Sequence, residues 1–134
     1  MSLDIQQSER EGIVIFDMKG RVTVGPEATS FREKVQKLVA GGTVKLILNL
    51  QHVDYIDSTG LGALVVASTT LRKADGVVKL LNLNRRNIEL LVMTKLATIF
   101  DIFTDEQDAV NSFFPDRKIK TFDILSFIRE QQEE

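Results

Sequence analysis

Within ten residues, Tyr55-Ile56-Asp57-Ser58-Thr59-Gly60-Leu61-Gly62-Ala63-Leu64, the chain changes from a strand pattern to a helix pattern. The preceding segment, Val44–Leu50, is an apolar run bounded by turn residues, which is typical of a strand covered on both faces. The inner face of the following helix is marked at helical spacing by Leu61, Leu64, Val65, Ser68 and Leu71. A strand that leads directly into a helix predicts an α/β unit, whose sites form at the carboxyl ends of the strands.

The same alternation extends to both sides of this unit. Towards the N-terminus, it predicts a strand hairpin from Leu3–Gln6 and Ile13–Phe16, then a helix over Pro26–Val39. Towards the C-terminus, it predicts a strand at Val77–Leu83, a helix capped by Asn84, a short strand at Ile99–Phe103, and a capping box at Thr104–Gln107 that opens a last helix. We therefore expect an α/β fold with a mixed, largely parallel sheet of about four to five strands and about four helices.

The pattern changes after Pro115, where a polar and charged segment begins. We expect residues 1–114 to form one domain and residues 115–134 to form a C-terminal appendage that is partly helical. A short amphipathic helix is predicted over Thr121–Glu130, with Phe122, Leu125 and Ile128 on one face together with Ile124. This face either docks on the domain or covers a surface in a second copy, and the second case gives a homodimer.

Composition excludes several classes of function. The chain has 134 residues, of which 43% are hydrophobic, and a net charge of −2, so no global electrostatic attraction to nucleic acid or anionic membrane is expected. It has no cysteine and one histidine, His52, which removes thiolate nucleophiles, Cys-based zinc sites and multi-His metal sites. No apolar run approaches the about 18 residues of a membrane span, and no signal-peptide core is found, so a cytoplasmic location is expected. The composition predicts no catalytic residue, no cofactor and no metal site.

Ser58 is the candidate functional residue. It lies at the start of a helix, where unpaired N–H groups and positive partial charge tolerate an anion such as a phosphate. Gly60 is expected to free the turn, and Gly62 to leave the first helical turn bare for a close partner. The simpler interpretation is that Ser58 only caps the helix. Neither a Walker loop nor a nucleophile elbow fits, because no Gly-Lys-Ser/Thr follows and Ile56 replaces the glycine that an elbow requires.

Residues 55–64 resemble the phosphorylation-site signature of STAS-domain anti-sigma factor antagonists, which are bacterial partner-switching phosphoproteins. The resemblance covers roughly Leu3–Phe113, because Val44–Leu50, Gly76–Leu83 and Leu96–Phe103 also match the layout of the family. It implies a STAS-type sheet and helices, with a binding role and no catalysis by this chain.

The resemblance also implies a site and its partners. Ser58 matches the phosphorylated serine, and the partner-binding surface comprises Asp57, Ser58, Thr59, Gly60, Leu61, Gly62 and Thr23. The unphosphorylated form would bind an anti-sigma factor that is also a serine kinase and so release the sigma factor. Phosphorylation of Ser58 would end that complex, and a PP2C-type phosphatase would restore it.

One segment departs from the family pattern. Many members carry Gly-Glu-Leu/Ile-Asp after the second strand, whereas this chain has Gly20-Arg21-Val22-Thr23. Thr23 therefore replaces an acid near the phosphorylation site, and Arg21 reverses the charge of the other acid. The alternative function is a STAS scaffold or transport-accessory module in which Ser58 is only a helix cap; an enzyme is the least favoured class.

Two further groups of charged residues have alternative interpretations. Asp54, Asp57 and Asp101 are better explained as surface carboxylates than as a cation site, since few ligands are present and nothing sets their spacing. Arg85 and Arg86 open the third helix, where acids are preferred. They are either a solvated pair or a patch for an acidic partner or a phosphate.

Overall fold

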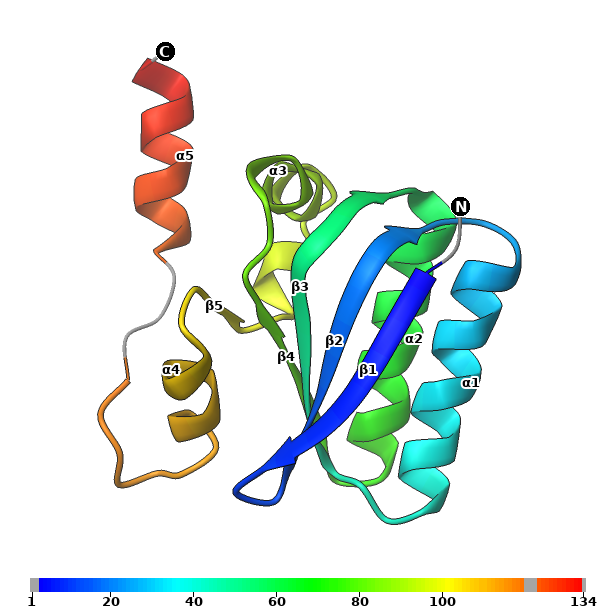
Figure 1. The fold of residues 1–134 in the computed structure, drawn as a ribbon. Helices are drawn as coiled ribbons and strands as arrows, with labels where there is room; N and C mark the ends of the chain where they lie inside the picture. Colours follow the sequence, from blue (N-terminus) through cyan, green and yellow to red (C-terminus); the bar gives the residue numbers. More distant parts are fainter. Residues whose placement is uncertain (1–2, 120–122, 134) are drawn as a thin grey trace.

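In the computed structural model, which describes residues 3–119 and 123–133, strands and helices alternate along most of the chain (Figure 1). The elements are β1 (Leu3–Arg10), β2 (Ile13–Val22), α1 (Pro26–Ala40), β3 (Lys45–Ile56), α2 (Ser58–Lys73), β4 (Val77–Leu81), α3 (Arg85–Met93), the 3-10 turn η1 (Leu96–Thr98), β5 (Ile102–Phe103), α4 (Glu106–Asn111) and α5 (Ile124–Glu133). The predicted α/β class is confirmed.

The five strands form one mixed sheet in the order β1-β2-β3-β4-β5. β1 and β2 pair antiparallel through a tight turn, in which Glu11 and Gly12 have φ angles of 53° and 83°. The remaining neighbours pair in parallel, as expected for strands joined by helical connections. The predicted hairpin and the predicted mixed, largely parallel sheet are both confirmed.

Several predicted strand ends are wrong. β2 continues past Phe16 to Val22, and β3 continues past Leu50 to Ile56. The second half of each strand mixes polar side chains, such as Asp17 and Asn49, with buried ones, because one face of the sheet is open there. An apolar run is therefore a poor guide to the strand end. Conversely, β4 ends at Leu81 rather than Leu83, and β5 is only Ile102–Phe103.

Two apolar clusters lie on opposite faces of the sheet. α1 and α2 run side by side along one face (Figure 1), where they bury the main core around Phe16, Phe31, Leu48 and Leu64. α4 packs on the other face against a smaller cluster that comprises Ile13, Ile15, Ile47, Leu81, Phe103, Ala109 and Val110. Large side chains of this kind each contribute about 1.5–3 kcal/mol when fully buried, so the main core dominates stability.

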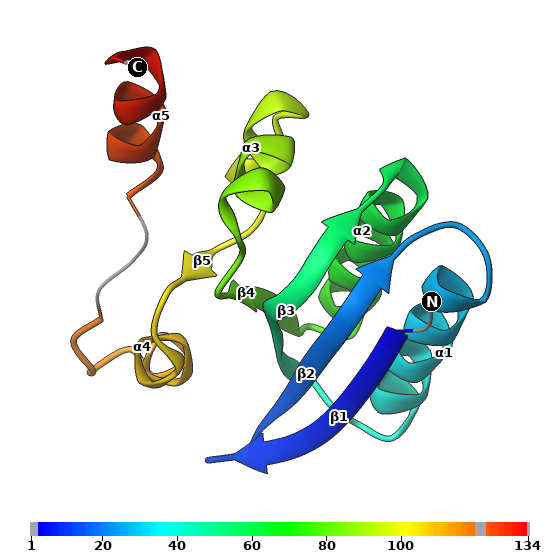
Figure 2. The same ribbon diagram turned by 45° about the horizontal axis from the view of Figure 1, so that its top comes forward.

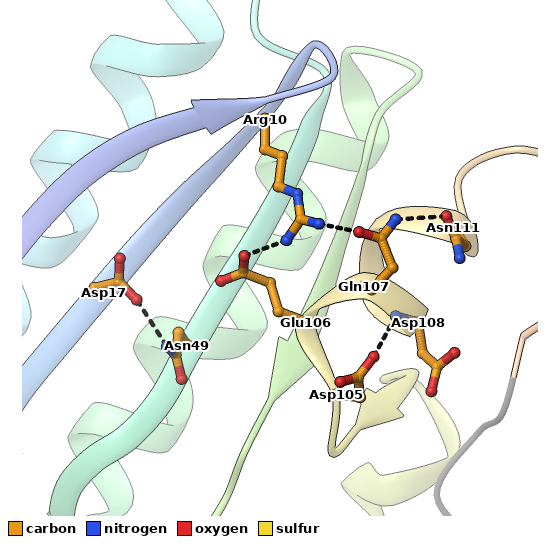
Figure 3. A network of polar contacts seen from close by, with 8 residues as sticks. All are labelled: Arg10, Asp17, Asn49, Asp105, Glu106, Gln107, Asp108 and Asn111. Atoms are coloured by element: carbon orange, nitrogen blue, oxygen red, sulfur yellow. Dashed lines mark hydrogen bonds and ion pairs between the residues drawn. The ribbon is translucent and has the colours of Figure 1, made fainter.

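Polar contacts also hold α4 on the sheet (Figure 3). The Arg10 guanidinium donates to Glu106 at 2.6 Å and to Gln107, whose amide donates to Asn111 at 2.8 Å. The predicted capping box is wrong by one residue, since Asp105 caps α4 and accepts from the backbone N–H of Asp108 at 3.0 Å. The Gln107 side chain pairs with Arg10 and Asn111, and so does not close the reciprocal box.

α5 stands beyond α3 and β5, away from α1 (Figure 2). The predicted helix is confirmed over its described part, whereas Thr121 and Phe122 lie outside the described residues. Ile124 and Phe127 pack against the main core, but Leu125 is 70% exposed. The division into a domain at 1–114 and an appendage at 115–134 stays a prediction. Over the described residues, no helix combines the length and apolarity that crossing a membrane requires.

Candidate functional site

The predicted site lies at one end of the sheet, where β2 and β3 finish and α2 begins. Val22 and Ile56 are register partners at the ends of these two parallel strands, and Asp57 alone separates β3 from α2. The sequence-based position of the site, at the carboxyl end of a strand, is therefore the position in the structure.

Asp57 caps α2 and ties it to a second segment. One carboxylate oxygen accepts the backbone N–H of Gly60 at 2.8 Å, and the other accepts that of Val24 at 2.9 Å. These hydrogen bonds stabilise the charged form and so hold the pKa of Asp57 below its ordinary value of 3.8. The bond from Gly60 lowers the pKa most, followed by the bond from Val24. The start of α2 and the β2–α1 loop are thus joined through one carboxylate.

The interpretation of Ser58 as the helix cap is wrong. Asp57 has the extended backbone of an N-cap residue and makes the capping bond, whereas Ser58 is the first residue of α2. In the described part of the chain, no hydrogen-bond partner is found for the Ser58 hydroxyl, and its side chain is exposed. Asp57 displaces it as the cap because a carboxylate has two acceptor oxygens and can serve two amides at once.

The two glycines of the site differ in their surroundings. A Cβ built on Gly60 would lie 1.8 Å from the carbonyl oxygen of Val22, so only glycine lets α2 approach β2. The expected reason, freedom of the turn, is wrong, since Gly60 does not have a positive φ. A Cβ on Gly62 would meet nothing within 4 Å, and Gly62 is exposed, which agrees with a bare first turn.

The remaining predicted site residues differ in how far they are exposed. Thr59 is exposed beside Ser58, and Thr23 is half-buried next to Val24, whose side chain is 66% exposed. Leu61 is only 7% exposed and belongs to the main core, so it shapes the surface from beneath. Val24 was missed by sequence reasoning; its place after Thr23 was the only available signal.

A second missed feature is a stack of three side chains from three segments. The guanidinium carbon of Arg86 lies 4.0 Å from the ring centre of Tyr55, and that of Arg21 lies 5.9 Å from it. Arg21 and Tyr55 are register partners on β2 and β3, and Arg86 is the second residue of α3. The sequence marked Arg86 as a candidate, but its contact with Tyr55 could not be predicted, because the two residues lie on different elements that only the fold brings together.

The other charged candidates are accounted for separately. Asp57 is bonded to backbone amides, Asp101 lies 3.6 Å from the Lys79 ammonium, and Asp54 and His52 are exposed. Over residues 3–119 and 123–133, no group of three or more His, Asp or Glu side chains is placed to hold a metal ion.

Comparison with known proteins identifies the family of the chain. The family model described as STAS domain matches residues 4–109. The chain belongs to the STAS-domain family. The match spans all five strands and most of α4, and it ends before α5.

Relatives of this STAS protein include the anti-sigma-B factor antagonist of Bacillus subtilis strain 168. The two are 33% identical over 110 residues, which cover 82% of this chain and 99% of the relative. Two solved structures show the same STAS fold. An anti-sigma factor antagonist from Mycobacterium paratuberculosis has a TM-score of 0.72 at 19% identity, covering 83% of this chain and 93% of that one. The Bacillus cell fate determinant SpoIIAA in its phosphorylated form has a TM-score of 0.66 at 18% identity, covering 82% and 99%.

Proposed function

We propose that this STAS protein is an anti-sigma factor antagonist controlled by phosphorylation of Ser58. The surface around the start of α2 binds an anti-sigma factor with serine kinase activity and so releases the sigma factor. Phosphate on Ser58 ends that complex, and a PP2C-type phosphatase removes the phosphate. The names of the bacterial relatives support the class of function. This chain supplies the acceptor hydroxyl and performs no catalysis.

The exposed position of Ser58 supports the proposal most directly. A kinase must reach the hydroxyl, and Ser58 is exposed on the first turn of α2 with Gly62 bare one turn on. The surface is also pre-formed, because Asp57 fixes the helix start and the β2–α1 loop together. A pre-formed surface loses little conformational entropy on binding.

The phosphate acts differently in the free protein and in the complex. In the free protein it lies at a helix N-terminus, where the first-turn N–H groups and the helix dipole favour an anion. In the complex it adds about two negative charges and bulk within a close interface, beside the Asp57 carboxylate. The folded protein is therefore expected to tolerate the phosphate, whereas the complex is not.

A comparison of charge at Ser58 tests this proposal. We expect Ser58→Ala to bind the anti-sigma factor kinase as the wild type does and to accept no phosphate. Ser58→Asp should bind on the order of tenfold more weakly, because it places a fixed charge in the interface. Isothermal titration calorimetry measures both affinities, and intact-mass analysis of protein from its native cells shows whether phosphate is present.

Ser8 provides the matched control, since it is an exposed serine on β1 that pairs with Ile15, away from the end of β2 at the site. Ser8→Asp makes the same substitution as Ser58→Asp and should neither block phosphorylation of Ser58 nor weaken binding. Equal binding by Ser58→Ala and Ser58→Asp would contradict the switch. Partners unrelated to sigma factors, with no phosphate under any growth condition, would favour the scaffold or transport-accessory function.

A further inference from the structure

Beside the Ser58 surface lies the Arg21–Tyr55–Arg86 stack, in which one aromatic ring carries two guanidinium groups at 5.9 and 4.0 Å. Both strand residues lead into the site, because Arg21 precedes Thr23 by two positions and Tyr55 precedes Asp57 by two positions. Guanidinium groups within about 6 Å of a ring centre are attracted by the ring. Two of the three side chains of the stack therefore lie on the strands that end at the proposed docking surface.

The backbone beneath Arg86 is held in place. The Asn84 side chain caps α3 by accepting the backbone N–H of Asn87 at 2.8 Å, and it donates to the carbonyl of Val53 at 3.2 Å. The Asn87 amide donates to the same carbonyl at 3.1 Å. These bonds fix the start of α3 to β3, so the backbones that carry Arg86 and Tyr55 are joined before any partner arrives.

Neither arginine of the stack forms an ion pair with an acid among the described residues. Arg21 and Arg86 are both exposed, and no ion pair of either with a carboxylate is found in the described part of the chain. The neighbouring Arg85 differs, because its guanidinium lies 3.4 Å from Glu89. Arg21 and Arg86 therefore bring two positive charges, without an ion pair in the described part of the chain, to a protein whose net charge is −2.

We propose that the Arg21–Tyr55–Arg86 stack selects the anti-sigma factor by binding an acidic segment of it. This inference rests on the function proposed above and names the chemistry of the partner. A planar guanidinium held on a ring presents its donors in the geometry that a carboxylate accepts through two parallel bonds. Arginine and tyrosine are also the residues enriched among those that dominate protein interfaces. An acidic protein segment fits this surface better than nucleic acid does, since two guanidinium groups can pair with a few carboxylates, whereas nucleic acid requires an extended basic patch.

Charge reversal of the two arginines tests the proposal. We expect Arg21→Glu and Arg86→Glu each to weaken binding of the anti-sigma factor kinase on the order of tenfold. Arg32→Glu, the matched control, makes the same charge change at an exposed position of α1 and should leave the affinity within about twofold. The affinities are measured by titration calorimetry at low and high salt, with thermal melts to verify folding.

A conservative variant separates geometry from charge. Arg86→Lys keeps the charge but loses the planar fork, and should bind several-fold more weakly than the wild type. The affinity of the wild type should fall with salt more steeply than that of Arg86→Glu, because fewer attractive charges remain in the variant.

The outcomes distinguish this inference from the function on which it rests. If Ser58→Asp loses affinity while Arg21→Glu and Arg86→Glu bind as Arg32→Glu does, the switch stands and the role of the stack is refuted. Failure of the wild type to bind the anti-sigma factor kinase would overturn both. Weaker binding by both arginine variants, with Arg32→Glu unchanged, supports the selection of an acidic partner.

Discussion

Asp57 is the residue on which the geometry of the site depends, since its two oxygens bind amides of two segments. We predict that Asp57→Asn lowers the free energy of unfolding by about 1 kcal/mol at pH 7, because the amide nitrogen cannot accept one of the two hydrogen bonds. Urea titration measures the loss. Asp105→Asn, at a cap that holds one such amide, should cost less.

The effect of Asp57→Asn should depend on pH. Because the pKa of Asp57 is lowered in the folded state, its charged form stabilises the fold above the ordinary value of 3.8. That stabilisation is lost as the pH falls through the lowered pKa. The gap between wild type and Asp57→Asn should therefore shrink in strong acid, and a constant gap would show that the capping charge is unimportant.

Gly60 and Gly62 provide a matched pair of substitutions. Gly60→Ala should cost about 1–3 kcal/mol or more, since its Cβ would overlap the Val22 carbonyl and force the backbone apart. Gly62→Ala should stabilise α2 by about 0.5–1 kcal/mol, because its Cβ meets nothing and alanine favours a helix. Thermal unfolding followed by circular dichroism compares them. Similar melting temperatures for the two variants would be inconsistent with these contacts.

Single residues mark the limit of what sequence reasoning could predict here. Asp57 and Ser58 are both good cap residues, and the choice depends on Val24, a contact 33 positions away. Similarly, the glycine pattern indicated a turn, whereas Gly60 is required by the approach of Val22. Both errors arise because the deciding contacts are tertiary.

At the level of elements, α4 depends on a lysine beneath it. Lys79 is 8% exposed, donates to the carbonyl and hydroxyl of Ser112 at 3.2 and 2.9 Å, and lies 4.6 Å from the ring centre of Phe113. Burial lowers its pKa below 10.5, and the Asp101 charge opposes that shift only in part. The ammonium therefore holds the end of α4 at a cost in desolvation.

We predict that wild-type stability rises relative to Lys79→Met as the pH increases towards 10. Between the lowered pKa and 10.5, the unfolded chain binds the Lys79 proton more tightly than the folded chain does, so the free energy of unfolding increases with pH. Urea titrations from pH 7 to about pH 10 measure the difference. If the free energy of unfolding of the wild type instead fell relative to that of Lys79→Met over this pH range, the prediction would be wrong.

The elements themselves were predicted better than their ends. The helix over Pro26–Ala40 follows from its apolar spacing and the Gly41 stop, and the hairpin follows from its turn. The ends of β2 and β3 were missed because polar side chains on the open face of the sheet interrupt the apolar runs. The pairing of Arg21 with Tyr55 follows only from a register that includes two irregularities.

At the level of the whole molecule, α5 lies wholly outside the family match. We predict that truncation after Lys118 leaves a cooperatively folded protein, since the sheet and both apolar clusters keep most of their members. The loss should be about 1–3 kcal/mol, from the contacts of Ile124 and Phe127. Urea titration measures it, and a non-cooperative transition would show that α5 is integral to the domain.

The homodimer predicted from the amphipathic pattern of this helix stays a prediction. Light scattering of the full chain and of the truncated chain tests it, because a dimer built on α5 would dissociate when α5 is removed. Leu125→Glu is the corresponding point variant, since Leu125 is 70% exposed. An unchanged mass in both would exclude α5 as the interface.

The alternation of strands and helices was sufficient to predict a mixed, largely parallel sheet with helical connections, but not the order of the strands in it. Parallel strands need long connections, and each helix between them had a clear apolar stripe. In the structure, α1 and α2 share one face of the sheet, while α4 covers the other. This arrangement was not predictable, because an apolar stripe shows that a helix packs against the sheet but not on which face.

The double hydrogen bond of Asp57 also provides a spectroscopic reporter. The backbone N–H groups of Val24 and Gly60 both donate to the carboxylate of Asp57, the residue just before Ser58. Amide protons bonded to a charged acceptor resonate downfield and exchange slowly with solvent. Two peaks in a proton–nitrogen correlation spectrum should therefore report a change at the site when the proposed phosphate is added to Ser58.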